Sequence, residues 1–99
     1  MKTLGTHNYF TYILTNKNKT VLYIGVTNNL HDRIKYHEEN KKNSFPFKYK
    51  CFYLIYFEYF SEITQAIARE KQLKGWKRDR KEELIANFNP NWKFLNNEI

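Results

Sequence analysis

The sequence predicts an α+β fold, in which a small, three-stranded, mainly antiparallel sheet is flanked by helices in the order β-β-α-β-α-α. Three observations predict this fold. Two runs rich in aromatic and β-branched residues flank a polar turn, a third such run follows later, and the segments after them carry apolar residues at helical spacing. The 99 residues are enough for one domain, which we take as residues 1–99.

The first two strands are predicted at Tyr9–Leu14 and Val21–Val26. Their sequences, YFTYIL and VLYIGV, consist mostly of aromatic and β-branched residues, which favour strands. The intervening segment 15–20, TNKNKT, is polar and contains two asparagines. This pattern is typical of a β-hairpin.

The first helix is predicted from about Asn29 to Asn40. Asn28 or Asn29 can cap its N-terminus, and Leu30 and Ile34 are spaced four residues apart, as on one face of a helix. The helix is followed by Lys41–Lys50, which has four lysines around a proline and no acid. We expect this segment to be a basic loop.

The second half of the chain predicts one strand and two helices. Cys51–Phe60, CFYLIYFEYF, is too apolar for a surface helix and is expected to form the third strand. Ser61 is the expected cap of a helix that ends at Gly75, and a short helix is expected at Asp79–Asn87. The apolar stripe of the longer helix is predicted to consist of Ile63, Ala66, Ile67 and Leu73.

Composition and charge exclude several classes of protein. Hydrophobic residues make up 41% of the chain and aromatic residues 18%, which excludes general disorder. The single cysteine, Cys51, excludes a disulfide scaffold and favours a cytoplasmic location. No run approaches the roughly 20 apolar residues that span a bilayer, so we expect no membrane association. The net charge of +7 favours a polyanionic partner, with nucleic acid ahead of acidic lipid.

Several catalytic classes are also excluded by their motifs. The chain has no P-loop, no GxGxxG and no nucleophile elbow, which argues against nucleoside triphosphate hydrolysis, dinucleotide binding and serine acyl transfer. One cysteine and three scattered histidines offer no closely spaced ligand pair for zinc.

Glu70 is the most informative charged position. It lies three residues after Ile67 and four after Ala66, on or beside the apolar stripe of its helix, and a buried carboxylate needs a partner. Two interpretations follow from this spacing. Glu70 is either a partly exposed residue paired with Lys71 or Lys74, or a ligand for Mg²⁺, which keeps several waters and needs few protein carboxylates.

Two further pairs carry chemistry only if the fold brings them into one cleft. Arg33 and His37 share a face of the first helix, where an arginine can hold a phosphate, although a solvated pair is the simpler interpretation. Tyr12 and Tyr23 become neighbours across the hairpin, although tyrosine is also an ordinary strand residue. A phenol needs nearby cations to act as a base near neutral pH.

Basic residues gather in two segments that can follow a phosphate backbone. One surrounds Trp76, and the other lies in the expected loop and contains Phe45. Each of these two aromatic residues is a candidate either to stack on unpaired bases or to complete the core. The candidate nucleic-acid-binding residues are Lys41, Lys42, Lys48, Lys50, Lys74, Lys77, Arg78, Arg80 and Lys81. Solvated lysine faces are common, so this pattern is only moderately specific.

Taken together, these motifs resemble the GIY-YIG nuclease superfamily, and more closely its small stand-alone group related to the nuclease domain of the excinuclease C subunit. The resemblance covers roughly Tyr9 to Leu95. It is carried by YFTYIL, by the Tyr-Ile-Gly that ends at Gly25, by VTNNLHDRIKYH, by AIAREKQLKGW and by the closing NPNW. The first motif has Phe-Thr where the family name has Gly-Ile, and Val26 follows the glycine where some members have lysine.

The resemblance implies a role for each matching residue. Tyr12 and Tyr23 match the paired tyrosines, one shaping the site and one assisting the water nucleophile, with their assignment left open. Gly25 matches the motif glycine, whose missing side chain allows close approach of phosphate or metal. Arg33 would stabilise phosphate charge, His37 would assist proton transfer, and Glu70 would bind the metal.

The resemblance therefore implies a DNA endonuclease dependent on Mg²⁺ or Mn²⁺, linked to DNA repair or recombination. Because larger members attach a separate DNA-targeting domain, we expect selectivity for DNA structure rather than sequence. RNA stays open as a substrate, and so does a homodimer whose two sites cut two strands. The alternatives are a nucleic-acid-binding module with weak or no catalysis, and a protein-interaction domain recruited to a repair complex.

Overall fold

The computed structural model describes residues 8–39 and 48–99, with side chains described up to residue 36 in the first stretch. It has one antiparallel sheet of strand order β2-β1-β3, so the central strand β1 pairs with both others. The elements are β1 (Tyr9–Thr15), β2 (Leu22–Thr27), α1 (Leu30–Glu39), β3 (Tyr53–Phe60), α3 (Ile63–Lys74), α4 (Arg78–Phe88) and a 3₁₀ turn (Asn96–Glu98). The predicted α+β class and element order are confirmed, and most of the predicted loop 41–50 lies outside the described residues.

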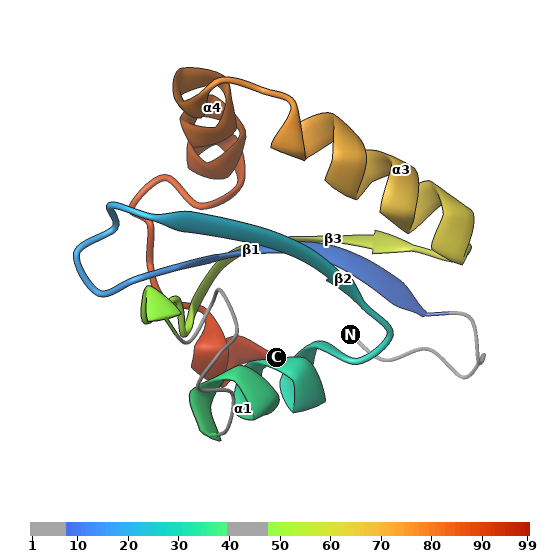
Figure 1. The fold of residues 1–99 in the computed structure, drawn as a ribbon, viewed down its shortest axis with the longest axis horizontal. Helices are drawn as coiled ribbons and strands as arrows, with labels where there is room; N and C mark the ends of the chain where they lie inside the picture. Colours follow the sequence, from blue (N-terminus) through green and yellow to red (C-terminus); the bar gives the residue numbers. More distant parts are fainter. Residues whose placement is uncertain (1–7, 40–47) are drawn as a thin grey trace.

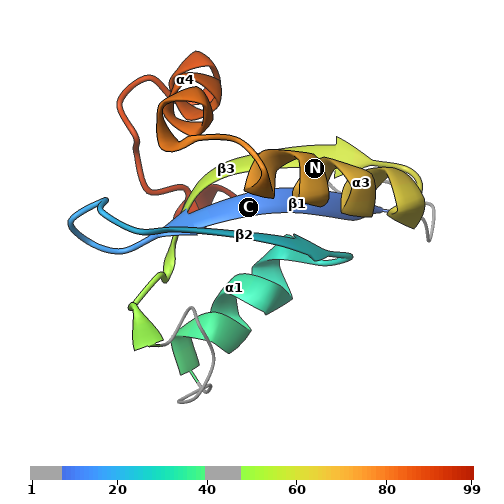
Figure 2. The same cartoon turned by 45° about the horizontal axis from the view of Figure 1, so that its top comes forward.

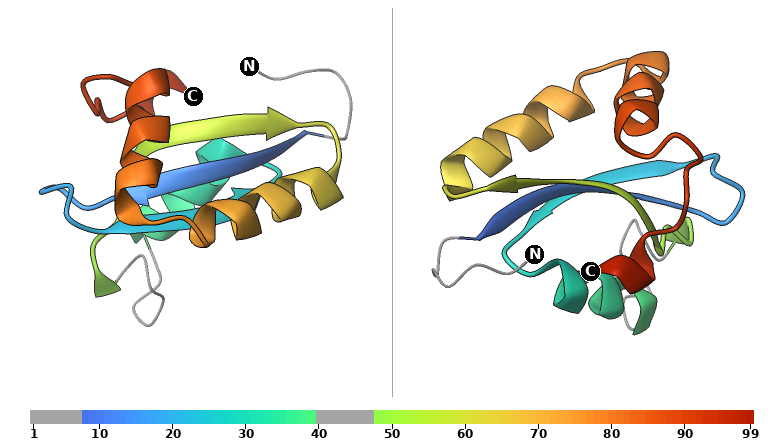
Figure 3. Two further views of the ribbon diagram at one scale, coloured as in Figure 1. Left: turned by 90° about the horizontal axis from the view of Figure 1, so that it is seen from above. Right: turned by 180° about the vertical axis from the view of Figure 1, so that it is seen from behind.

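The helices cover the two faces of the sheet unequally. α3 and α4 lie over one face, while α1 and the C-terminal segment lie against the other (Figure 1, Figure 2). Seen from above, α3 runs along the sheet and α4 crosses its far end (Figure 3). No helix within the described part of the chain is long and apolar enough to cross a membrane.

Each face of the sheet has its own hydrophobic core, because successive strand residues point to opposite faces. The core under α1 is formed by Phe10, Tyr12, Leu14, Leu30, Ile34, Cys51, Leu54 and Leu95. The core under α3 and α4 is formed by Ile13, Ile24, Ile55, Tyr56, Leu73 and Ile85. A β-bulge in the pairing of β1 with β3 explains why Ile55 and Tyr56, although adjacent, both belong to the second core.

The hairpin turn is held by one asparagine and braced by one arginine. Asn16 Oδ1 accepts hydrogen bonds from the backbone N–H groups of Thr20 and Val21, at 2.8 and 3.0 Å. Arg78, at the start of α4, donates to the backbone oxygens of Lys19 and Thr20 at 3.0 and 2.9 Å. The first residue of α4 is therefore tied to the hairpin that carries both tyrosines.

The segment after α4 is tied back to β3 by two asparagine side chains. Buried Asn89, in the closing NPNW motif, donates to the carbonyls of Ile55 and Lys93 at 3.0 and 2.8 Å. Asn96 accepts from the backbone N–H of Leu54 and donates to the carbonyl of Phe52, both at 2.8 Å. These bonds satisfy backbone groups along one edge of the sheet, so the motif serves the fold.

The predicted start of α3 and its buried face need correction. Glu62 rather than Ser61 occupies the N-cap position, and it makes no side-chain capping bond. Ile63 and Ile67 are 40% and 38% exposed, although the spacing assigned them to the buried stripe. Buried Ala66 explains this, because its carbonyl accepts a 2.8 Å hydrogen bond from Thr11 on β1 and so fixes the helix rotation.

A polar network lies between β3 and α3. Arg69 Nε donates to Glu58 Oε1 at 2.9 Å, and its Nη1 donates to Gln72 at 2.7 Å. The hydroxyl of buried Tyr56 donates to Glu58 Oε2 at 3.1 Å. Burial and the charge of Glu58 raise the pKa of Tyr56 to about 12, so this phenol keeps its proton at neutral pH.

Candidate nuclease site

The centre of the site is Tyr12, which is fully buried on central strand β1. The antiparallel register places it directly opposite Gly25 on edge strand β2. A Cβ atom at Gly25 would lie 2.5 Å from the Tyr12 hydroxyl oxygen and 2.7 Å from ring atom Cζ. The space beside Gly25 is thus occupied by the phenol of Tyr12, and this contact is a sufficient reason for glycine at this position.

The second tyrosine lies outside the first. Tyr23 is on the same face of β2 as Gly25, and its ring centroid is 6.4 Å from that of Tyr12, with 47° between the rings. Tyr23 is half-buried, whereas Tyr12 has no exposed surface. Of the two phenols, Tyr23 therefore meets solvent more readily.

Arg33 is delivered to the same place by α1, whose start is fixed locally. The Asn29 side chain accepts a 3.0 Å hydrogen bond from the backbone N–H of Asp32, which makes it the predicted cap of the helix. The Thr27 hydroxyl accepts from the backbone N–H of Asn29 at 3.1 Å and holds the turn between β2 and α1. Arg33 follows within the first turns of this helix and is half-buried.

The guanidinium of Arg33 has two neighbours that are aromatic. It hydrogen-bonds with Tyr12 and lies 5.8 Å from the ring centroid of Tyr36. No ion pair to Arg33 occurs among the residues that the structure describes. Within the described structure, the positive charge of Arg33 is therefore not neutralised by an ion-paired carboxylate.

Glu70 reaches the site from the opposite side of the sheet, on α3. Its side chain is 21% exposed and accepts an ion-paired hydrogen bond from Lys74 Nζ at 2.9 Å. Lys74 is one of the two lysines that the spacing left open as partners of Glu70. The charge of Glu70 also acts on Tyr12, so the carboxylate lies within electrostatic range of the two motif strands.

The pKa of Tyr12 depends on its burial and on the charges of the groups around it. Burial is the largest effect and raises its pKa far above the ordinary value, and Tyr23 and Glu70 raise it further. The charge and hydrogen bond of Arg33 act in the opposite direction, but they do not outweigh burial. Tyr12 thus stays a neutral phenol at neutral pH in this structure.

The donor set for a metal is small. Among the described residues there is no group of three His, Cys, Asp or Glu side chains that could hold a metal ion. Glu70 alone suits Mg²⁺ or Mn²⁺, because such hard cations keep several waters and take further oxygen ligands from a substrate phosphate. A cation bound there would have to replace Lys74 as the partner of Glu70.

The remaining predicted residues differ in their freedom to act. The side chain of His37 lies outside the described residues, as do Lys41 and Lys42. Lys48, Lys50, Lys77 and Arg80 are exposed, and Lys81 is half-buried. Arg80 stacks on Trp76 with 4.1 Å between its Cζ and the ring centroid, which leaves its outer edge for a phosphate. Lys74 and Arg78 are already engaged, the latter by Glu82 at 2.9 Å and by the hairpin.

One feature of the site was missed by sequence reasoning. A groove of about 340 Å³ runs along the start of α1 beside Arg33, and it is lined by Thr27, Asn28, Asn29, Asp32, Arg33 and Tyr36. Tyr36 follows Arg33 by three residues on α1, about one helical turn. This spacing predicts that the two side chains share one face of the helix, and it was the sequence signal for the groove.

The fold and the arrangement of the two tyrosines, the glycine, the arginine and the glutamate define a GIY-YIG domain. The sequence accordingly matches the GIY-YIG catalytic domain over residues 8–83. It is 36% identical over 77 residues to a UPF0213 protein of Clostridium perfringens, CPE1444, covering 78% of this chain and 82% of that protein. It is 34% identical over 82 residues to the UPF0213 protein YazA of Bacillus subtilis, covering 83% and 82%.

A solved structure supports the same assignment. The solution NMR structure of the UPF0213 protein BH0048 from Bacillus halodurans superposes with a TM-score of 0.51 at 28% identity, covering 80% of this chain and 83% of that one. The chain belongs to the GIY-YIG family and, within it, to the UPF0213 group. The domain places it in a nuclease family, with nucleic acid as the implied substrate.

Proposed function

We propose that this protein is a DNA endonuclease dependent on Mg²⁺ or Mn²⁺, which selects DNA structure rather than sequence and acts in excinuclease-like repair or recombination. The observation that carries the proposal is the convergence on Tyr12. Arg33 from α1 and Glu70 from α3 approach from opposite faces of the sheet, and both act electrostatically on this one buried phenol. An arginine without an ion pair in the described structure suits a phosphodiester, and a carboxylate suits its metal ion.

Each residue then has a distinct task in hydrolysis. Arg33 binds a non-bridging phosphate oxygen and stabilises the negative charge that develops as the water oxygen attacks phosphorus. Tyr12 keeps its proton, and its hydroxyl oxygen accepts a hydrogen bond from the Arg33 guanidinium and so holds that group in place. The water proton passes to the phenolate form of Tyr23 or to the neutral imidazole of His37, and the bond from phosphorus to the leaving oxygen breaks as that oxygen takes a proton from solvent. Glu70 would hold the metal ion, which polarises the phosphate and lowers the pKa of bound water.

Selectivity for structure follows from the kind of contacts that the surface offers. Four cations are exposed: Lys77 just before α4, Arg80 on α4, and Lys48 and Lys50 before β3. Side chains of this kind contact phosphates, which position DNA without reading its sequence. DNA affinity should therefore fall steeply with salt concentration.

The test is cleavage of supercoiled, flap and branched DNA with Mg²⁺, Mn²⁺ or EDTA. The wild type should cut in the presence of metal, and Glu70→Gln should lower the rate at least about 100-fold without weakening DNA binding. Glu82→Gln is the matched control, because it breaks an ion pair of the same i, i+4 spacing and the same 2.9 Å length on α4. DNA binding without metal-dependent cleavage would support the binding module instead.

A further inference from the structure

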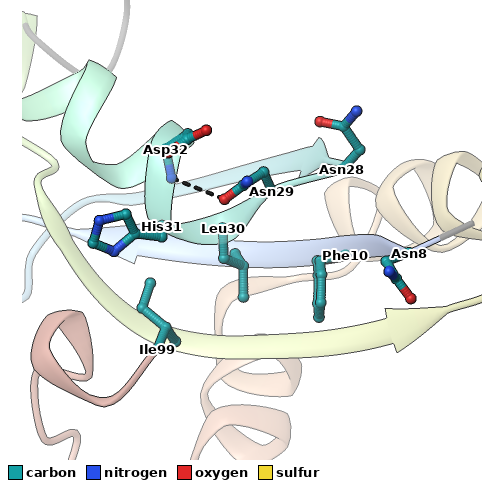
Figure 4. A pocket seen from close by; sticks show the side chains of 8 residues that line it. All are labelled: Asn8, Phe10, Asn28, Asn29, Leu30, His31, Asp32 and Ile99. Carbon is teal, nitrogen blue, oxygen red and sulfur yellow. Dashed lines mark hydrogen bonds between the residues drawn. The ribbon is translucent and has the colours of Figure 1, made fainter. Parts of the chain in front are cut away.

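A second cavity lies next to the groove of Arg33. It has a volume of about 430 Å³ and lies between the start of β1, the first turn of α1 and the C-terminal residue Ile99 (Figure 4). Its described lining residues are Asn8, Phe10, Asn28, Asn29, Leu30, His31, Asp32 and Ile99. The volume is within the roughly 300–1,000 Å³ of small-molecule sites.

The lining of this cavity is apolar in the middle and polar at the ends. Figure 4 shows Phe10, Leu30 and Ile99 around the central space, with the Asn8 amide toward one end and the His31 imidazole toward the other. Phe10 is held edge-on by Tyr59, with 5.7 Å between ring centroids, so the apolar floor is rigid. A flat apolar ligand with a polar edge matches this distribution.

The polar side chains that line the cavity determine which polar edge of a ligand can bind there. Asn28 and His31 make no side-chain hydrogen bond or ion pair within the part of the chain that the structure describes. Asparagine amides pair with a donor and an acceptor at once, and a carboxylate such as Asp32 accepts from an exocyclic amine. The described lining of the cavity contains Asp32 but no arginine or lysine, whereas the groove adds Arg33, so the cavity favours a neutral heterocycle and the groove a phosphate.

The position of the cavity connects it to the nuclease site. Asn28, Asn29 and Asp32 line both this cavity and the groove that contains Arg33. A nucleotide whose phosphate lies against Arg33 can therefore place a base on the other side of this shared wall. Bases inside a duplex are stacked and cannot enter, whereas an unpaired base can.

We propose that this cavity binds one unpaired nucleobase next to the scissile phosphate. Its location relative to cleavage rests on the proposed function, while base binding itself does not. The substrate is then DNA with an unpaired nucleotide at a junction, bulge or frayed end. The shared wall of Asn28, Asn29 and Asp32 sets the distance between the base and the cleaved bond.

The test uses two labelled DNA hairpins that differ at a single unpaired position beside the stem. One carries 2-aminopurine there, and the other carries an abasic residue. Binding in EDTA is measured by anisotropy for the wild type, for Asn28→Ala/His31→Ala and for Asn18→Ala. Asn28 precedes the capping residue Asn29, so its replacement leaves the cap of α1 in place. Asn18 is an exposed asparagine in the hairpin turn and serves as the matched control.

We expect the wild type and Asn18→Ala to bind the 2-aminopurine hairpin about tenfold more tightly than the abasic one. The double variant should bind both hairpins equally, with the affinity that the wild type has for the abasic hairpin. Equal wild-type affinities, or a base preference that survives in the double variant, would overturn the proposal. Cleavage with Mg²⁺ is scored separately. A base preference without cleavage would refute only the nuclease function, and cleavage without a base preference would refute only the base site.

Discussion

The sheet carries two buried tyrosines, each beside an arginine and a glutamate, and the two sets pair their charges differently. In the Tyr56 set, Arg69 and Glu58 bond directly to each other at 2.9 Å, and the phenol donates to the same carboxylate. In the Tyr12 set, Arg33 hydrogen-bonds with the phenol while Glu70 is paired with Lys74. The same three residue types thus give a closed network in one place and an open one in the other.

The difference shows that the way the charged side chains are paired, rather than which residue types are present, distinguishes a structural network from a candidate catalytic one. A direct arginine–carboxylate bond satisfies both charges and joins β3 to α3. In the Tyr12 set the described structure has no direct arginine–carboxylate bond, so the arginine keeps its attraction for an outside anion. Substitutions made in parallel in the two sets can sharpen or break this contrast.

The largest expected effect comes from the arginines. Arg33→Gln should lower the rate of DNA cleavage about 100- to 1,000-fold, because it removes the charge that stabilises the transition state. Arg69→Gln should leave the rate within about threefold of wild type, and instead lower the free energy of unfolding by about 1–2 kcal/mol by stranding Glu58. Cleavage rates and urea unfolding measure both. Equal losses of cleavage in the two variants would break the contrast.

The next effect tests the packing of the Tyr12 set. Gly25→Ala should lower the free energy of unfolding by about 2–3 kcal/mol, because the new methyl group collides with the phenol of Tyr12. Gly75→Ala is the matched control, since its nearest atom outside its chain neighbours, the Gln72 carbonyl oxygen, is at 3.5 Å and its φ is −82°. That variant should be neutral or slightly stabilising. A fully stable Gly25→Ala protein would contradict the tight contact.

A smaller effect separates the two phenols. Tyr12→Phe should slow cleavage about tenfold, because Arg33 loses the hydroxyl that holds its guanidinium. Tyr56→Phe should cut at the wild-type rate, since its hydroxyl bonds only within the Glu58 network in the described structure. Single-turnover cleavage with saturating protein measures both. A slow Tyr56→Phe enzyme would show that the second set also serves the reaction.

The smallest effect concerns alkaline pH. Burial raises the pKa of Tyr56 from 10.0 to about 12, so above pH 10 the unfolded chain loses this proton while the folded protein keeps it. Stability should therefore fall as pH rises from 10 toward 12, by on the order of 1 kcal/mol at pH 11. Thermal unfolding between pH 8 and 11 measures the slope. Tyr56→Phe should make the slope shallower, with Tyr12 accounting for the part that remains, and an unchanged slope would contradict the role of the Tyr56 phenol.

Local sequence patterns were enough to predict the fold. Alternation and aromatic content marked the strands, and Asn29 marked the start of α1, because these features depend on neighbouring residues. Helix rotation depends on contacts between distant residues. The bond from Thr11 to Ala66 exposes Ile63 and Ile67, and nothing within α3 itself announces that bond.

The candidate site could likewise be predicted only where it depends on the spacing of residues within one element or one hairpin. Spacing placed Tyr12 near Tyr23 across the hairpin and left Lys74 open as a partner of Glu70, and both features are present. The bracing of the hairpin by Arg78 and the cavity beside Phe10 join segments far apart in the chain. Such features arise only when the elements are packed.

The contact between Tyr12 and Gly25 has a consequence for reading related sequences. Because the phenol fills the space where a side chain would stand, the two positions form one packing unit, and a descendant that had lost catalysis would still need both. Their presence in a relative is therefore a signature of the fold. Arg33 and Glu70 fill no comparable space in the described structure, so under the proposed function their loss would mark a relative that no longer carries out the chemistry.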